Sequence, residues 1–336
     1  MAEVIPTVVA EVQGYYQRME ALLLYRGVFD HPIGQAFRTL LEALQSESTT
    51  AALRAYSDWF QALAEARETW ASYLQRQIAY ADNAFSQAVQ TLELKHLPPA
   101  LVQAATQDLA LLQQFHALET AQVAAWVQVV GDLAHAPIPW SMGNPPPVPW
   151  TWEAATPWTS ILPALAQHYR QQGVGRLAQY RVFTWQAGDL QGIAHPDPVR
   201  LDQLTAYDHP RQQLIQNTLA LLQGYPALNV LLYGSRGTGK SSLVKALLNE
   251  YAPQGLRLVE VAKAELVALP QIMERLRAAP QKFIIFVDDL SFEEDDDAFK
   301  ALKVVLEGSV TARPQNVVVY ATSNRRHLVR EYFSDR

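Results

Sequence analysis

Short apolar runs alternate with longer amphipathic segments along the second half of the chain. The expected strands, rich in apolar residues, lie at 180–185, 230–233, 257–261, 282–287 and 316–321. The expected helices, with apolar residues at helical spacing, lie at 161–173, 201–223, around 243–248, at 264–279 and at 297–306. Strands that are apolar throughout and alternate with helices predict an α/β fold, in which helices cover both faces of a parallel sheet. Ligands of such folds bind at the carboxyl ends of the strands.

The first 135 residues follow a helical pattern instead, with few glycines or prolines. Apolar residues from 50 to 96 recur close to heptad spacing, with Arg67 at one seam position, which predicts one helix over this segment. Pro98-Pro99 ends that helix and suits the first turn of the next, expected over 101–133. The pattern favours an antiparallel α-helical bundle, with the aromatic positions in its core rather than in a cofactor site. The alternative is a long helical arm that binds a partner or a sister subunit.

A segment rich in proline and tryptophan, 136–160, divides the chain. It holds four of the eight tryptophans and the run Pro145-Pro146-Pro147, which favours an extended linker whose tryptophans dock on a neighbouring surface. We therefore expect a helical bundle domain at 1–135, a linker at 136–160 and an α/β domain at 161–336.

The composition narrows the classes of function. No apolar run approaches the roughly 18 residues of a membrane span, and the N-terminus lacks the basic start and apolar core of a secretory signal. The absence of cysteine excludes disulfides and thiolate metal sites. We expect a cytoplasmic protein without membrane contact. The net charge of −6 argues against a general nucleic-acid surface.

The residues after the strand at 230–233 carry the strongest chemical signal. GSRGTGKS fits the phosphate-binding pattern G-x-x-x-x-G-K-[ST] at every fixed position. Glycines let backbone N–H groups turn inward, and the following helix N-terminus favours an anion. Lys240 would reach the β- and γ-phosphates of ATP, and the Ser241 hydroxyl would bind Mg²⁺. The strand before and the helix after make a chance glycine-rich turn the weaker interpretation. The expected nucleotide-binding residues are Gly234, Ser235, Arg236, Gly237, Thr238, Gly239, Lys240, Ser241 and Ser242.

Two further expected strands end in polar residues. Asp288 and Asp289 follow the strand at 282–287, and Asn324 follows the strand at 316–321. Asp288 would hold Mg²⁺, Asp289 would orient or polarise the attacking water, and Asn324 would bond the γ-phosphate or that water. Alone, the aspartate pair would indicate only an acidic turn. Beside a phosphate loop it predicts a catalytic site of Lys240, Asp289 and Asn324, with Ser241 and Asp288 as metal ligands.

The helix expected at 201–223 leads into the phosphate-loop strand. Its residues Leu204, Ala206 and Tyr207 could form an adenine wall, and ordinary core packing is the alternative.

These motifs resemble the Walker A, Walker B and sensor-1 elements of the AAA+ ATPases. LLYGSRGTGKSSLVKALLNEY, FVDDLSFE, KALKVVLEGS and ATSNRRHLV more closely resemble a bacterial AAA+ family of unknown function, family 815 of the domains of unknown function, over about 160–336. The resemblance implies a P-loop NTPase domain that binds ATP with Mg²⁺ and assembles into a homo-oligomeric ring. It implies no substrate.

The sequence departs from the AAA+ pattern in two respects. Asp289 stands where most members have Glu, which shortens the side chain by one methylene, although helicase loaders also use an Asp pair. The residues after Asn324 contain no counterpart of the C-terminal lid, sensor 2 or the arginine-finger region, and surface solvation is the better interpretation of Arg325, Arg326 and Arg336. The acidic run 293–297 favours a solvated loop.

The main hypothesis is an AAA+ ATPase that uses ATP to remodel, or assemble with, a protein partner. A loader-like ATPase associated with nucleic acid is less favoured, on the basis of the Asp pair and Arg325-Arg326. A third hypothesis is a nucleotide switch or scaffold that does not hydrolyse ATP. A small-molecule kinase is the weakest, because no second-substrate site is evident.

Overall fold

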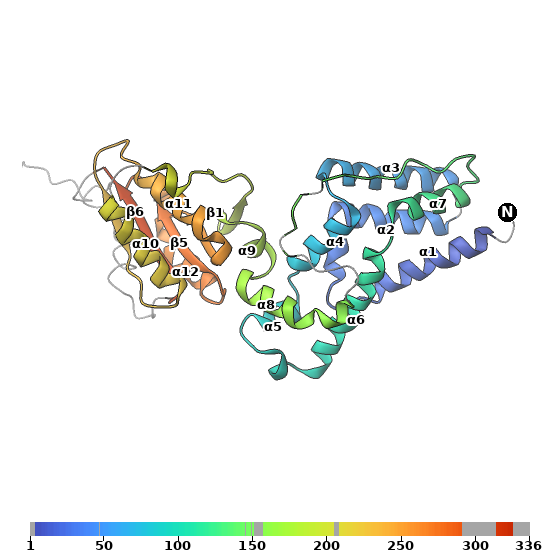
Figure 1. Cartoon of the computed structure of the whole chain (residues 1–336), viewed down its shortest axis with the longest axis horizontal. Helices are drawn as coiled ribbons and strands as arrows, with labels where there is room; N and C mark the ends of the chain where they lie inside the picture. Colours follow the sequence, from blue (N-terminus) through green and yellow to red (C-terminus); the bar gives the residue numbers. More distant parts are fainter. Residues whose placement is uncertain are drawn as a thin grey trace, which may run out of the picture. The chain divides into compact units, whose positions relative to one another are not determined.

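A computed structural model describes residues 4–46, 48–144, 146–148, 150, 157–204, 208–290 and 314–324. The chain forms two compact units, Met1–Arg170 and Gln171–Arg336, which we call the helical unit and the α/β unit (Figure 1). No helix in the described ranges combines the length and apolarity needed to cross a bilayer.

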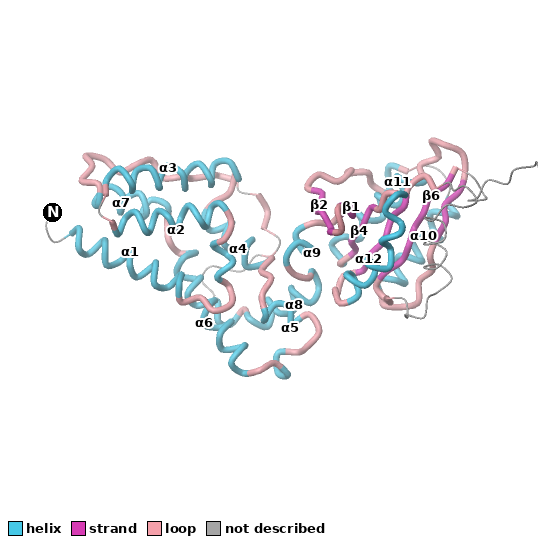
Figure 2. Tube along the Cα trace, turned by 180° about the vertical axis from the view of Figure 1, so that it is seen from behind, coloured by secondary structure: helices cyan, strands magenta, loops and turns pink. Residues whose placement is uncertain are grey.

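The helical unit is built from helices joined by loops and turns (Figure 2), and aromatic side chains form much of its core. Phe37 lies at its centre, with ring centroids 4.4 Å from Trp70 and 5.5 Å from Trp59, and all three side chains are buried. The prediction that the aromatic positions form core is confirmed. The helices are α1 (Val4–Glu20), α2 (Pro32–Gln45), α3 (Thr49–Ala66), α4 (Trp70–Ala79), α5 (Ala84–Val89), α6 (Pro99–His116), α7 (Thr120–Val130) and α8 (Leu162–Gln172), with 3₁₀ turns at Arg26–Phe29, Leu94–His96 and Trp158–Ser160.

The heptad-like segment 50–96 is not one helix, and that expectation was wrong. Arg67 adopts a left-handed conformation, φ 54°, and ends α3. Thr69 and Ser72 then form a capping box that starts α4, and Asn83 caps α5 in the same way. Each cap satisfies N–H groups that a continuous helix would have bonded internally, so the chain can break the helix at little cost. A single long arm over 50–96 is therefore excluded.

The proline- and tryptophan-rich segment docks on the helical unit wherever it is described. Trp140 Nε1 donates to Glu68 O at 2.8 Å, the Trp150 ring stacks on His168, and Trp158 is buried. Trp152 lies outside the described residues. Trp140 and Trp150 are half-buried, so the fully buried Trp158 contributes most of the apolar area that stabilises this attachment.

The α/β unit is a six-stranded sheet in the order β2-β1-β4-β5-β6-β3. All neighbouring strands are parallel except the β1–β2 hairpin, so the prediction of a mainly parallel α/β sheet is confirmed. The strands are β1 (Val182–Gln186), β2 (Asp189–Ile193), β3 (Val230–Tyr233), β4 (Leu256–Glu260), β5 (Lys282–Val287) and β6 (Val317–Ser323). The helices are α9 (Gly175–Gln179), α10 (Asp208–Leu222), α11 (Lys240–Tyr251) and α12 (Leu269–Arg277), with 3₁₀ turns at Leu201–Gln203, Ala252–Gln254 and Lys263–Ala268.

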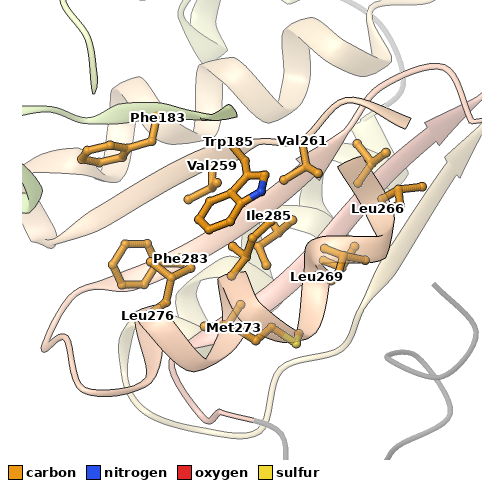
Figure 3. Close-up of a cluster of buried hydrophobic side chains, with 14 of the residues drawn as sticks. Phe183, Trp185, Val259, Val261, Leu266, Leu269, Met273, Leu276, Phe283 and Ile285 are labelled. Carbon is orange, nitrogen blue, oxygen red and sulfur yellow. The ribbon is translucent and has the colours of Figure 1, made fainter. Parts of the chain in front are cut away.

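Two apolar cores hold this sheet between helices. On one face, Leu269, Met273 and Leu276 of α12 pack with Phe283 and Ile285 of β5, and Figure 3 shows the Trp185 ring among them. On the other face, α10 and α11 pack against alternate residues of the same strands, such as Ile284 and Phe286. Because side chains alternate across a strand, a continuous apolar run serves both cores. The three layers hold the strand ends rigidly.

Two histidines, the buried His168 and the half-buried His116, make the stability of the helical unit depend on pH. Burial lowers the pKa of His116 and of His168 below the ordinary 6.5, and the bond from His168 Nε2 to Ala79 O partly opposes this for His168. The unfolded chain therefore takes up protons first as the pH falls. The resulting stability is fully present above pH 6.5 and is lost below it. We expect a lower urea midpoint at about pH 5.5 than at about pH 7.5, measured by tryptophan fluorescence.

The variant His168→Gln isolates part of this effect, because glutamine keeps a donor for Ala79 O and does not titrate. Its urea midpoint should change less between the two pH values than that of the wild type. Burial raises the pKa of Glu68, against the nearby charge of Arg76, so Glu68 acts in the opposite direction in both proteins and cancels in the comparison. Equal pH dependence of wild type and variant would contradict the role of His168.

Candidate functional site

The predicted site residues gather at one edge of the sheet, where three parallel strands end. β6 lies between β3 and β5, with Ser323 opposite Tyr233 and Ala321 opposite Val287. The loop after β3, Gly234–Ser241, therefore begins beside the end of β6, and Gly234 N donates to Ser323 O at 3.2 Å. The sheet register alone brings together segments about 50 and 90 residues apart in sequence.

The loop backbone depends on its glycines. Gly237 and Gly239 have φ of 75° and 78°, a region that side chains disfavour, and Gly234 has φ of 152°. An added Cβ would meet no atom within 4 Å at Gly237 or Gly239, so the backbone angle and not the space selects glycine there. Gly239 is the N-cap of α11. The first turn of that helix leaves N–H groups without intrahelical partners, and these suit an anion.

The ammonium group of Lys240 reaches back over this loop. Its Nζ donates to Gly234 O at 2.9 Å and to Ser235 O at 2.8 Å. It also lies 3.4 Å from Asn324 Oδ1 and 3.5 Å from Thr238 Oγ1. The positive charge therefore sits between the loop and the end of β6. Together with the α11 N-terminus, it makes the loop suited to a phosphate group.

Three donors converge on one oxygen of the Asp288 carboxylate. Ser241 Oγ donates to Asp288 Oδ1 at 2.7 Å, Thr322 Oγ1 donates to the same oxygen, and Asp289 N approaches it at 3.2 Å. Ser241 is the second residue of helix α11, whereas Asp288 follows β5. The two predicted metal ligands are thus in direct contact.

Asp289 lies beside this pair in an unusual backbone conformation. Its φ is 51°, in the left-handed region, where Asp and Asn are the best-tolerated residues other than glycine. Its Oδ1 accepts a hydrogen bond from Asn324 Nδ2 at 2.5 Å, and its N–H donates to Thr322 Oγ1 at 2.9 Å. The conformation explains why a short carboxylate fits here.

The structure brings most of the predicted residues into one network. Lys240, Ser241, Asp288, Asp289 and Asn324 are linked by the contacts above. Thr238 Oγ1 donates to Ser235 O at 3.0 Å within the loop, Arg236 is exposed, and Ser242 is half-buried. Leu204 packs partly buried with the α10–α11 core, which is the ordinary packing alternative. The predicted positions outside the described residues are Ala206, Tyr207, Arg325, Arg326, Arg336, the acidic run 293–297 and the helix at 297–306.

Sequence reasoning missed Thr322. Its side chain is 1% exposed, and its hydroxyl joins Asp288 to Asp289. The available signal was a threonine at the polar end of an otherwise apolar strand, where a buried hydroxyl requires a partner.

The donor set fits Mg²⁺ better than a transition metal. Within the described part of the chain, no three His, Asp or Glu side chains cluster as metal ligands. Ser241 Oγ and Asp288 supply hard oxygen donors, and Mg²⁺ typically takes one or two such protein ligands and completes its shell with water and phosphate. These residues could therefore hold Mg²⁺ only together with a bound phosphate.

The part of the chain that holds this site matches a known protein family. Residues 178–336 match the model of a family described as a protein of unknown function, DUF815. After this similarity we call residues 178–336 the DUF815 region. The predicted resemblance to family 815 is confirmed over these residues, and every site residue above lies within the DUF815 region. The AAA+ assignment stays a prediction. No curated protein matches the chain.

Proposed function

We propose that the protein is a P-loop ATPase of AAA+ type that binds Mg²⁺-ATP through the DUF815 region and couples its turnover to assembly with, or remodelling of, a protein partner. The observation that supports this most is the 2.7 Å contact of Ser241 Oγ with Asp288 Oδ1. This contact joins the expected metal ligand of the phosphate loop to the expected metal ligand after β5, which is 47 residues away in sequence. The contact lies beside Lys240 of the loop.

The phosphate loop and the start of α11 would bind the nucleotide. The N–H groups at the start of α11 and the ammonium of Lys240 would hold the phosphates, in exchange for the bonds that Nζ makes to Gly234 O and Ser235 O. Ser241 and Asp288 would hold Mg²⁺, which when bound neutralises phosphate charge.

Hydrolysis would be the work of Asp289 and Asn324. Asp289 would accept the proton of an attacking water, and Asn324 would orient the carboxylate through its 2.5 Å bond to Oδ1. Asn324 Oδ1 also lies near Lys240 Nζ. One amide would therefore contact both the lysine that binds the phosphates and the carboxylate that accepts the proton of the water.

A second candidate is a nucleotide switch that binds ATP without turnover. The bond from Asn324 to Asp289 favours it, because it occupies one of the two carboxylate oxygens and a hydrogen bond to the charged form lowers the basicity of the group. The loader-like hypothesis has no support of this kind among the described residues, and ring assembly stays a prediction.

Nucleotide binding and phosphate release separate these candidates. We expect a fluorescent ATP analogue to bind the full chain more tightly with Mg²⁺ than with EDTA. We also expect the protein to release phosphate from ATP at a rate proportional to its concentration. Tight binding without phosphate release would select the switch. Absence of Mg²⁺-dependent binding would overturn both candidates.

A further inference from the structure

One buried hydroxyl, that of Thr322, contacts both aspartates of the site. Thr322 is the second-to-last residue of β6, and its Oγ1 donates to Asp288 Oδ1 while accepting the N–H of Asp289 at 2.9 Å. A hydroxyl has one proton to donate and lone pairs to accept, so it can make both bonds at once. Valine has the same shape and can make neither.

Two further hydrogen bonds, one to the backbone of β6 and one from the Ser323 side chain, anchor the same turn. Leu290 N donates to Thr322 O at 2.7 Å, and Ser323 Oγ donates to Leu290 O at 2.8 Å. Both neighbours of the left-handed Asp289, Asp288 and Leu290, are thereby hydrogen-bonded to β6. Such a conformation is strained for a residue other than glycine and persists only where its surroundings fix it.

We propose that Thr322 is a positioning residue for the metal site, an inference that rests on the proposed binding of Mg²⁺-ATP. The donors from Ser241, Thr322 and Asp289 converge on Asp288 Oδ1, which fixes the plane of the carboxylate and leaves Oδ2 to a cation. Without the Thr322 hydroxyl, the carboxylate loses one donor and the N–H of Asp289 loses the nearer of its two acceptors. Loss of such outer contacts typically lowers metal affinity about 10–100-fold.

The test is the affinity of the protein for Mn²⁺ in the presence of ATP, measured by electron paramagnetic resonance without any turnover. Thr322→Val should weaken nucleotide-dependent Mn²⁺ binding by about 10-fold or more, whereas Thr322→Ser, which keeps the hydroxyl, should stay within about threefold of the wild type. Thr322→Ala serves as a second deletion of the hydroxyl if valine prevents folding. Affinity for the fluorescent ATP analogue in EDTA should be unchanged in all three.

Thr218→Val is the matched control. Thr218 is fully buried in α10, and its hydroxyl donates to Leu214 O at 2.8 Å and contacts the Tyr320 hydroxyl at 2.9 Å, neither of which belongs to the site. It should lower the urea midpoint and leave Mn²⁺ affinity unchanged. If Thr322→Val and Thr218→Val bind Mn²⁺ as tightly as the wild type, Thr322 has only a structural role, while the proposed function stands. If the wild type binds neither the analogue nor Mn²⁺, the proposed function fails and this inference fails with it.

Discussion

Replacing Lys240 with alanine is expected to lower the affinity for ATP at least about 100-fold while the protein stays folded. The ammonium would make charge-assisted hydrogen bonds to the phosphates, worth together about 3 kcal/mol or more. Nζ bonds carbonyl oxygens of a loop in contact with water, so water can replace it there and the urea midpoint should change little. Titration with the fluorescent ATP analogue measures the loss.

Lys245→Ala provides the control for charge. Lys245 lies on the same helix, α11, but its Nζ lies 3.6 Å from the Asp197 carboxylate. The variant Lys245→Ala removes an equal charge from the same helix and leaves the phosphate loop unchanged. ATP affinity within about threefold of the wild type is expected for this variant, since exposed ion pairs contribute little. Unchanged ATP affinity in Lys240→Ala itself would refute the assignment of the loop.

The sheet could be predicted because its central strands are apolar throughout. Such runs as 282–287 can only be buried on both faces, and their alternation with helices fixes the parallel class. The strand β2 could not be predicted in this way. It is a short edge strand joined to β1 through Ala187 and Gly188, which both have positive φ. Alanine is not typical of such a turn, so no second strand was predicted directly after the one at 180–185.

The helical unit shows where periodicity fails. A heptad-like pattern records which residues face the core, and it persists across a break when the next helix packs against the same core. The breaks after Ala66 and Ala79 depend on caps by Thr69 and Asn83, which are local side-chain contacts. Residue types that cap helices are also common away from helix ends. The apolar pattern was therefore given more weight than these residues, and one continuous helix was predicted.

The candidate site was largely predictable, because its residues follow strands whose ends meet. The contacts within it were not. The left-handed conformation of Asp289 and the bridge through Thr322 depend on how the turn after β5 packs on β6. In the sequence, the short side chain of Asp289 was evident only as a departure from the AAA+ pattern, in which most members have Glu. The positive φ offers a physical reason for it, because Asp tolerates that region better than Glu.

Asp289→Asn should leave ATP binding within about threefold of the wild type and slow phosphate release about 100- to 10,000-fold, the usual contribution of a general base. Asparagine has the same size, tolerates positive φ, and can still accept the bond from Asn324 through its side-chain oxygen. The substitution therefore removes the charge and the basicity while keeping the turn. Binding of the analogue and release of phosphate are measured on the same sample.

Asp202→Asn makes the same chemical change at an exposed position of the α/β unit, 4.0 Å from Arg200, and should alter neither quantity. Phosphate release from Asp289→Asn at the wild-type rate would exclude Asp289 as the base and leave the water to another group. Loss of ATP binding together with turnover would instead mean that the carboxylate charge acts on the bound nucleotide or its Mg²⁺. Only a selective loss of turnover agrees with a base, because a base contributes to the transition state and not to the bound ground state.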